Sequence, residues 1–221
     1  MVTARGVAGC VLLAFALGCA AYRIAGQVES GRRALLVNDP ERALPYFSEA
    51  AKNDPNYVYV SDRFRETVWT YLGRSQYATQ RYAEARQSLE RALALDRDDH
   101  LARLYLGLTL TRLGDTANGV KEIEAAMKGI YDWLDYMERS RPFEAYWDPA
   151  REIRKTIEKD LAGDPPAREV GRDQLIADAE WLGKRMEDEV EYVRRDRRRE
   201  FEGDMEWRRG RGLGVGIGIG F

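Results

Sequence analysis

The strongest indication of the fold class is "WTYLGRSQYATQRYAEARQSLERALALDR", residues 69–97. Its apolar residues recur three and four positions apart, which predicts helices rather than strands. Gly73 falls inside the first of these helical patterns. A glycine there costs about 1 kcal/mol relative to alanine, so it needs a packing reason. We interpret Gly73 as a point where another helix approaches closely.

Two other stretches align with this one: "GRRALLVNDPERALPYFSEAAKNDP" at residues 31–55 and "LYLGLTLTRLGDTANGVKEIEAAMKG" at residues 104–129. Gly73 and Gly107 are 34 residues apart, which is the tetratricopeptide period. Trp69, Leu72 and Gly73 spell W-x2-L-G. Residues 24–129 therefore resemble a tetratricopeptide array.

The resemblance implies an all-α solenoid of about three antiparallel helix pairs, because one pair cannot bury its apolar face alone. The aligned glycines then lie at the crossing within each pair, beside small and apolar residues of the second helix. These core positions are Gly31, Gly73, Gly107, Ala43, Ala85, Phe47, Leu89 and Ile123. None of them is expected to be catalytic.

One interval is longer than the period. Gly31 and Gly73 are 42 residues apart, and the extra residues fall near "YVYVSDRFR", residues 57–65. We expect a longer loop or an extended first helix there. Tyr57 and Tyr59 either pack between repeats or face a partner.

Residues 130–164 are aromatic and charged and suit capping helices, which a terminal repeat needs. Asp148-Pro149 predicts a helix start, with the aspartate as cap and the proline in the first turn. That helix should end near Leu161. The cluster of Phe143, Tyr146 and Trp147 is either buried against the last repeat or a platform for a peptide or glycan.

Residues 165–209 predict one long charged helix, from near Asp173 to about Arg208. Its apolar stripe is narrow enough for a coiled-coil seam, packed on the cap or on another copy, so a homo-oligomer is one possibility. The run 194–199 either binds anionic groups or is a solvated face with Glu191–Arg195 and Arg198–Glu202 pairs. The stripe consists of Leu175, Ala179, Leu182, Met186, Val190 and Val193, continued by Phe201 and Met205.

The C-terminal tail, residues 210–221, alternates glycine with apolar residues. As a strand, it would carry all its large side chains on one face. We expect it to add to the sheet edge of a partner or a second copy; a flexible end is the alternative. The apolar residues are Leu213, Val215, Ile217, Ile219 and Phe221.

The N-terminus has the form of a signal. Arg5 precedes an apolar run, Val7–Leu17, that is too short to span a bilayer. The run ends at Gly18-Cys19 and resembles the lipobox of bacterial lipoproteins. The resemblance implies a signal peptide over residues 1–18, a lipidated Cys19 and a short anchor over residues 19–23. An uncleaved anchor and an ordinary signal peptide are the alternatives.

The lipoprotein resemblance also implies a compartment. Ala20 follows the cysteine, where aspartate tends to retain a lipoprotein in the inner membrane, so we expect the outer membrane, facing the periplasm. Several acyl chains together would hold the protein stably.

Other functions are disfavoured by composition. The net charge of −2 gives no field that attracts nucleic acid, and one histidine is too few for a typical metal site. No P-loop or G-x-S-x-G motif is present. We therefore expect no enzyme and no cofactor, although a periplasmic enzyme of an unfamiliar class is a third, less favoured hypothesis.

The leading hypothesis is a scaffold that binds an envelope protein of the secretion, pilus or polysaccharide machinery in its concave groove. The resemblance implies that Arg32, Arg74, Tyr77 and Arg112 face this groove. Arginines there suit carboxylates of the bound chain. The alternative is a structural subunit whose tail is the main contact and whose groove is idle.

Overall fold

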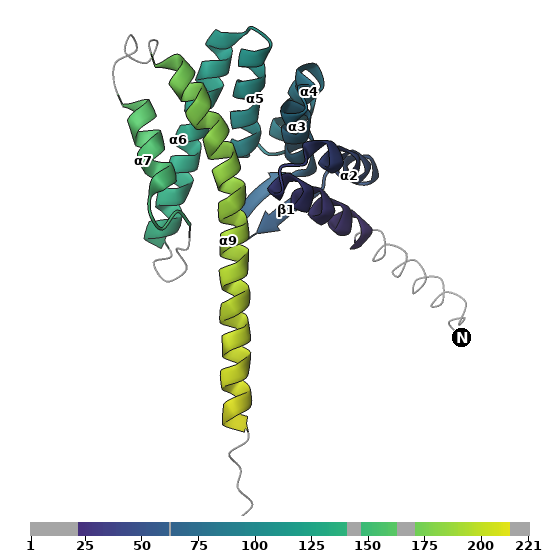
Figure 1. The fold of residues 1–221 in the computed structure, drawn as a ribbon, viewed down its shortest axis with the longest axis vertical. Coiled ribbons are helices and arrows are strands. Elements are labelled where there is room, and N and C mark those ends of the chain that lie inside the picture. Colours follow the sequence, from purple (N-terminus) through teal and green to yellow (C-terminus); the bar gives the residue numbers. More distant parts are fainter. Residues whose placement is uncertain (1–21, 62, 141–146, 163–170, 213–221) are drawn as a thin grey trace, which may run out of the picture.

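The computed structural model describes residues 22–61, 63–140, 147–162 and 171–212, and most of these are helical (Figure 1). Three antiparallel helix pairs follow one another, which confirms the all-α solenoid. They are residues 22–36 with α2 (Pro40–Asn53), α3 (Val68–Ala78) with α4 (Tyr82–Leu95), and α5 (His100–Arg112) with α6 (Thr116–Ser140).

The glycines of the repeats lie where the paired helices touch. A Cβ added to Gly31 would lie 2.6 Å from the ring of Phe47, and one at Gly73 would lie 2.5 Å from Cγ of Leu89. At Gly107 the obstacle is backbone, because the added atom would lie 2.7 Å from the carbonyl oxygen of Gly119. These contacts confirm that the glycines permit close helix approach.

The insertion between the first two pairs is a β-hairpin, so the expectation of a loop or an extended helix is wrong. Strand β1 (Val58–Ser61) pairs antiparallel with β2 (Phe64–Thr67), and Tyr59 lies opposite Glu66. The β-branched and aromatic residues of the "YVYV" stretch favour a strand. The last residue of the hairpin, Thr67, also caps α3 and donates its N–H to the buried carboxylate of Asp99.

The cap consists of the extended end of α6 and the short helix α7 (Glu152–Leu161). The helix starts later than Asp148-Pro149 predicts, because Arg151 adopts a left-handed conformation just before it. Asp148 still caps it from a distance, since its carboxylate accepts the N–H groups of Ile153 and Arg154.

Trp147 is buried in the cap. Its ring packs edge-on against Trp133 of α6, with centroids 4.8 Å apart, and near Phe64 of the hairpin. This favours the buried alternative for Trp147, while Phe143 and Tyr146 lie outside the described residues.

The long helix α9 (Arg172–Gly212) runs along the helix pairs and then projects from the body (Figure 1). Its first half is buried through the predicted stripe, from Leu175 to Val193. Its end at Gly212 lies three residues beyond residue 209, where the long helix was expected to end. Among the described residues, no helix is long and apolar enough to cross a membrane.

The described part of the chain contains two apolar cores. One joins residues 22–36, α2 and the start of α3 around Phe47 and Tyr71. The other joins α4, α5, α6, α7 and α9 around Leu104, Ile123 and Leu182. Between them lies a cluster of charged side chains that includes Arg32, Arg74 and Glu66.

Candidate functional site: the concave groove and the helix within it

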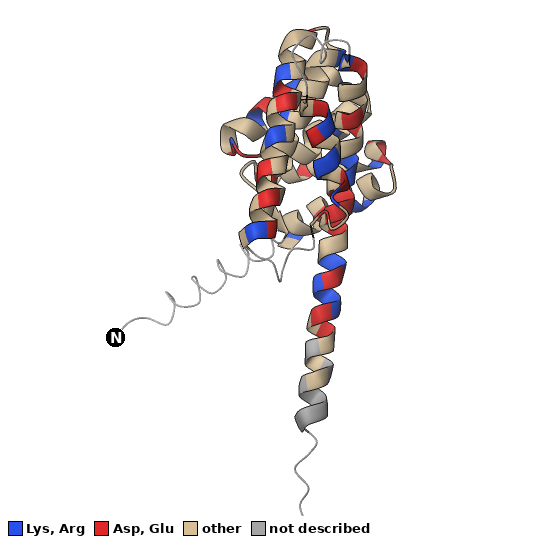
Figure 2. Cartoon of the chain, turned by 90° about the vertical axis from the view of Figure 1, so that its left-hand side faces the viewer, with Lys and Arg blue, Asp and Glu red and all other residues tan. Residues whose placement is uncertain are grey.

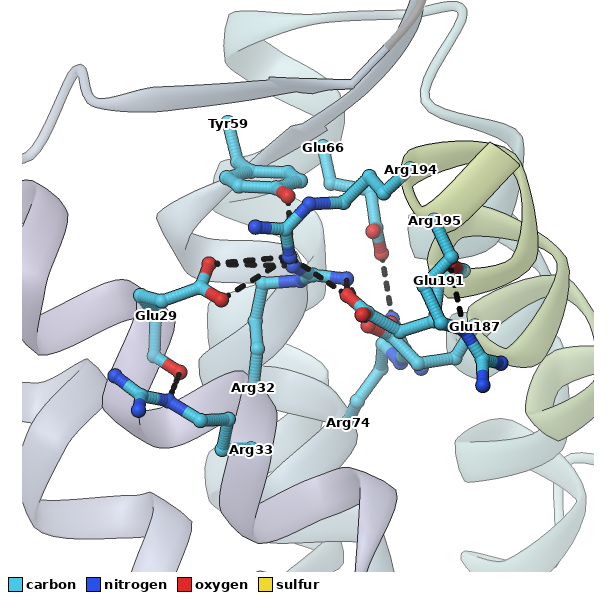
Figure 3. Close-up of polar contacts among 10 residues, drawn as sticks. All are labelled: Glu29, Arg32, Arg33, Tyr59, Glu66, Arg74, Glu187, Glu191, Arg194 and Arg195. Atoms are coloured by element: carbon cyan, nitrogen blue, oxygen red, sulfur yellow. Dashed lines mark hydrogen bonds and ion pairs between the residues drawn. The ribbon is translucent and has the colours of Figure 1, made fainter. Parts of the chain in front are cut away.

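The concave groove is lined by the first helix of each pair, and α9 lies in it. All four residues that were expected to face the groove contact α9: Arg32, Arg74, Tyr77 and Arg112. Figure 3 shows Arg32 and Arg74 converging on the acidic side chains of α9. The carboxylates they meet therefore belong to the same chain.

Arg32 is fully buried and makes the widest set of contacts. Its Nη2 donates to Glu187 at 2.7 Å and to Glu191 at 2.9 Å, both on α9. Its Nη1 donates to the hydroxyl of Tyr59 at 2.6 Å, and its guanidinium carbon lies 4.2 Å from the centre of that ring. The hairpin thus supplies one wall of the arginine site, which answers the question of how Tyr59 packs.

Arg74 is the second buried cation. Its Nη1 donates to Glu66 of the hairpin at 2.6 Å and to the second carboxylate oxygen of Glu187 at 3.0 Å. Glu187 therefore bridges the two arginines. Burial raises the pKa of Glu66 to about 7, even though the charge of Arg74 lowers it.

A third contact lies at the more exposed end of the groove. Glu180 of α9 accepts hydrogen bonds from the hydroxyl of Tyr77 at 2.5 Å and from Nη2 of Arg112 at 2.7 Å. Burial opposes ionisation of Glu180, but these two donors outweigh it and lower its pKa. This carboxylate is charged at neutral pH.

The acidic residues of α9 lie on one face. Glu180, Glu187 and Glu191 are seven and four residues apart, which are spacings of two turns and one turn. The buried apolar stripe runs beside them along the same helix. The groove therefore recognises an amphipathic helix with a row of carboxylates, and α9 is such a helix.

The ion pairs differ from those expected within the long helix. Glu191 binds Arg32 and Arg194, whereas Arg195 donates to the backbone carbonyl of Glu191 at 3.3 Å. Arg194 also reaches Glu29 in the first helix at 3.0 Å. Spacing within α9 could not reveal Arg32 and Glu29 as partners, because both lie in the first helix, far away in the sequence.

Helix α9 does not fill the groove completely. A cleft of about 690 Å³ remains between α9 and the first two helix pairs. Its walls combine apolar and charged groups, among them Leu35, Pro40, Arg74, Tyr77, Glu180 and Asp188.

Other predicted site residues lie outside the described residues. These are Cys19 and the tail residues Leu213, Val215, Ile217, Ile219 and Phe221. Within the described ranges, no group of three or more His, Cys, Asp or Glu side chains is arranged to hold a metal ion.

Comparison with known proteins supports the repeat assignment. A family model described as tetratricopeptide repeat matches residues 72–131, which extend from α3 into α6. No curated protein matches the chain. The match and the helix pairs together identify residues 72–131 as a tetratricopeptide repeat region, and such repeats indicate a role in binding proteins.

Proposed function

We propose that this protein is a non-catalytic scaffold subunit of the bacterial envelope that presents a helical arm to its partner. The arm is the projecting part of α9, residues 195–212, together with the tail that follows it. One observation carries the proposal: the groove residues expected to hold a partner, Arg32 and Arg74, already hold α9. The repeats then act as the clamp that fixes the arm.

The energetics of the clamp favour a lasting attachment. Arg32, Arg74, Glu66 and Glu187 are buried and pair with one another, as Figure 3 illustrates. Replacing one member of such a pair by an uncharged residue leaves an uncompensated buried charge, which typically costs about 3–5 kcal/mol. A partner that entered the same place would have to replace both these ion pairs and the apolar contacts of the stripe.

A second candidate function is capture of a partner helix in the groove. The remaining cleft beside Arg74 and Tyr77 favours it, because it gives an incoming chain a place to start. Such a partner would need carboxylates at the spacing of Glu180 and Glu187. In this case α9 would be a competitor that the partner displaces.

Two variants separate these functions. Deleting residues 196–221 removes the arm but keeps Arg194 and the clamp residues, whereas Arg112→Glu reverses a half-exposed groove charge. We avoid Arg74→Glu, because it would remove the cation of the buried Glu66 and place another carboxylate beside it. Loss of the envelope partner after the deletion, with retention in Arg112→Glu, supports the arm. The opposite pattern supports the groove.

The location in the envelope rests on the N-terminal sequence, which resembles a lipoprotein signal ending at Cys19. We propose a lipid anchor at this cysteine in the outer membrane, with the remainder of the chain in the periplasm. The wild-type protein should incorporate labelled palmitate, and Cys19→Ser should not. Absence of label from the wild-type protein would refute the anchor but would leave the arm hypothesis intact.

A further inference from the structure

The arm is a helix that leaves the body, and no other element of the described ranges lies beside it (Figure 1). Val193 is the last fully buried residue of the stripe, and Phe201 and Met205 continue it into solvent with 67% and 39% of their surface exposed. Figure 1 shows this part of α9 extending away from the helix pairs. An apolar stripe that continues beyond the body indicates a second surface for packing.

The charges within the arm both support and oppose the helix. Asp196 pairs with Arg199 at 3.6 Å, and Arg198 and Glu202 are opposite charges four residues apart. Arg194 and Arg198, Arg195 and Arg199, and Asp196 and Glu200 are like-charged pairs four residues apart, a spacing at which like charges repel. Gly203 adds a residue that disfavours helix, and a Cβ there would meet nothing within 4 Å.

The order of basic and acidic residues along the arm indicates what the arm binds. Residues 195–199 contain four arginines and one aspartate, and residues 200–206 contain four acidic residues and no basic one. Figure 2 shows basic and acidic residues along the projecting helix. If two arms run antiparallel, the basic block of each lies against the acidic block of the other. A parallel pair would place like charges together.

We infer that the arm binds the arm of a second copy, antiparallel, about a two-fold axis near Phe201. This rests on the proposed function and names the partner of the arm. The interface is isologous, so one favourable contact between blocks occurs twice. Interhelical charges of this kind set orientation in coiled coils. Phe201 of each copy lies at the centre of the seam, where the exposed stripe is covered.

The geometry leaves room for two bodies. The arm of residues 195–212 is about 27 Å long at 1.5 Å per residue. With the two-fold axis near Phe201, residue 195 of one copy lies opposite residue 207 of the other, so the two bodies lie at opposite ends of a seam about 18 Å long. So short a seam falls among the weak interfaces that bury less than about 1,200 Å², so the dimer should dissociate on dilution.

Sedimentation velocity of the full chain in mild detergent, over a concentration series, tests the inference. The wild-type chain should pass from monomer to dimer as concentration rises. Arg198→Glu/Arg199→Glu should weaken dimerisation at least about tenfold, because acidic blocks then face each other. The fourfold variant that adds Glu200→Arg/Glu202→Arg exchanges the blocks and should restore the dimer. All variants share the same anchor and body, and their helix content checks the fold.

Three results would overturn the inference. The wild-type chain could remain monomeric, the charge-reversed variant could dimerise as well as the wild type, or the exchanged variant could fail to recover. The proposed function is tested separately by loss of the envelope partner on deletion of the arm. A monomeric chain that still needs its arm to retain that partner would refute the self-association and leave the proposed function standing.

Discussion

Glu187 is the residue on which the position of α9 depends most. Its two carboxylate oxygens bind Arg32 at 2.7 Å and Arg74 at 3.0 Å, so one side chain joins the first two repeats to the long helix. Buried ion pairs of this kind contribute more to specificity than to net stability, because desolvation offsets much of their attraction. They fix which face of α9 lies in the groove.

At the helix crossings, a single added methyl group should be harmful. A Cβ at Gly107 would lie 2.7 Å from the carbonyl oxygen of Gly119 and 2.8 Å from the N atom of Ile123, and backbone cannot move aside cheaply. Overpacking typically costs about 1–3 kcal/mol. Gly107→Ala should therefore lower the melting temperature. Gly203→Ala, at a glycine with open space around it, should not lower it. If both substitutions lowered the melting temperature equally, Gly107 would not lie at a close helix crossing.

The buried carboxyl of Glu66 predicts a dependence on pH. Its pKa rises from 4.5 to about 7 in the folded chain. Between these values the folded chain holds a proton that the unfolded chain has released, so the free energy of unfolding should fall as pH rises through this window. Glu66→Gln should show a smaller fall. Urea unfolding at roughly pH 5 and pH 7 measures how much the free energy of unfolding of the wild type and of Glu66→Gln changes with pH. If both proteins changed equally, Glu66 would not be the group with the raised pKa.

Among the elements, α9 has two halves with different roles. The half from Leu175 to Val193 is a core helix, and the half beyond it is the arm. Leu182 is fully buried, whereas its neighbour Trp181 is 39% exposed. Removing a buried leucine side chain typically costs about 2–5 kcal/mol, so Leu182→Ala should destabilise the fold strongly.

The matched control is Trp181→Ala, which removes a larger side chain from the exposed side of the same helix turn. Chemical unfolding monitored by circular dichroism gives the free energy of unfolding of Leu182→Ala and of Trp181→Ala. If Trp181→Ala proved the more damaging, α9 would pack on the body through a different face.

The sequence predicts the repeated elements well, because their signals are local. The Gly73–Gly107 period and the stripe from Leu175 to Val193 are patterns of residue spacing within a segment. In the structure both glycines and the whole stripe lie in helices. The hairpin was missed because four-residue strands give a short alternation, and its pairing partner, Phe64–Thr67, has no strong pattern.

The candidate site was predicted in part. The family resemblance implies that Arg32, Arg74, Tyr77 and Arg112 face the groove, and in the structure each of them contacts α9. Their occupant was not predicted, because Glu187 is 113 residues from Arg74 and no local spacing connects them. The alignment of carboxylates on α9 with arginines of the repeats exists only in the folded chain.

At the scale of the whole molecule, two apolar cores meet across a charged layer, and α9 spans it. The second core holds α9 by apolar packing, and the first helix pair reaches α9 through Arg32, which binds Glu187, and through Glu29, which binds Arg194. Such a layer specifies one arrangement of the cores, because a shifted helix would leave buried charges unpaired. The direction of the arm is set by this arrangement.

Hydrogen exchange along α9 tests the central claim, that this helix is bound in the groove of its own chain. At a protein concentration where the arm is monomeric, amides of residues 175–193 should exchange far more slowly than those of residues 195–212. Glu187→Lys should accelerate exchange in the first half and leave the second unchanged. Equally fast exchange along the whole helix in the wild-type protein would show that α9 is not held in the groove and would contradict the account.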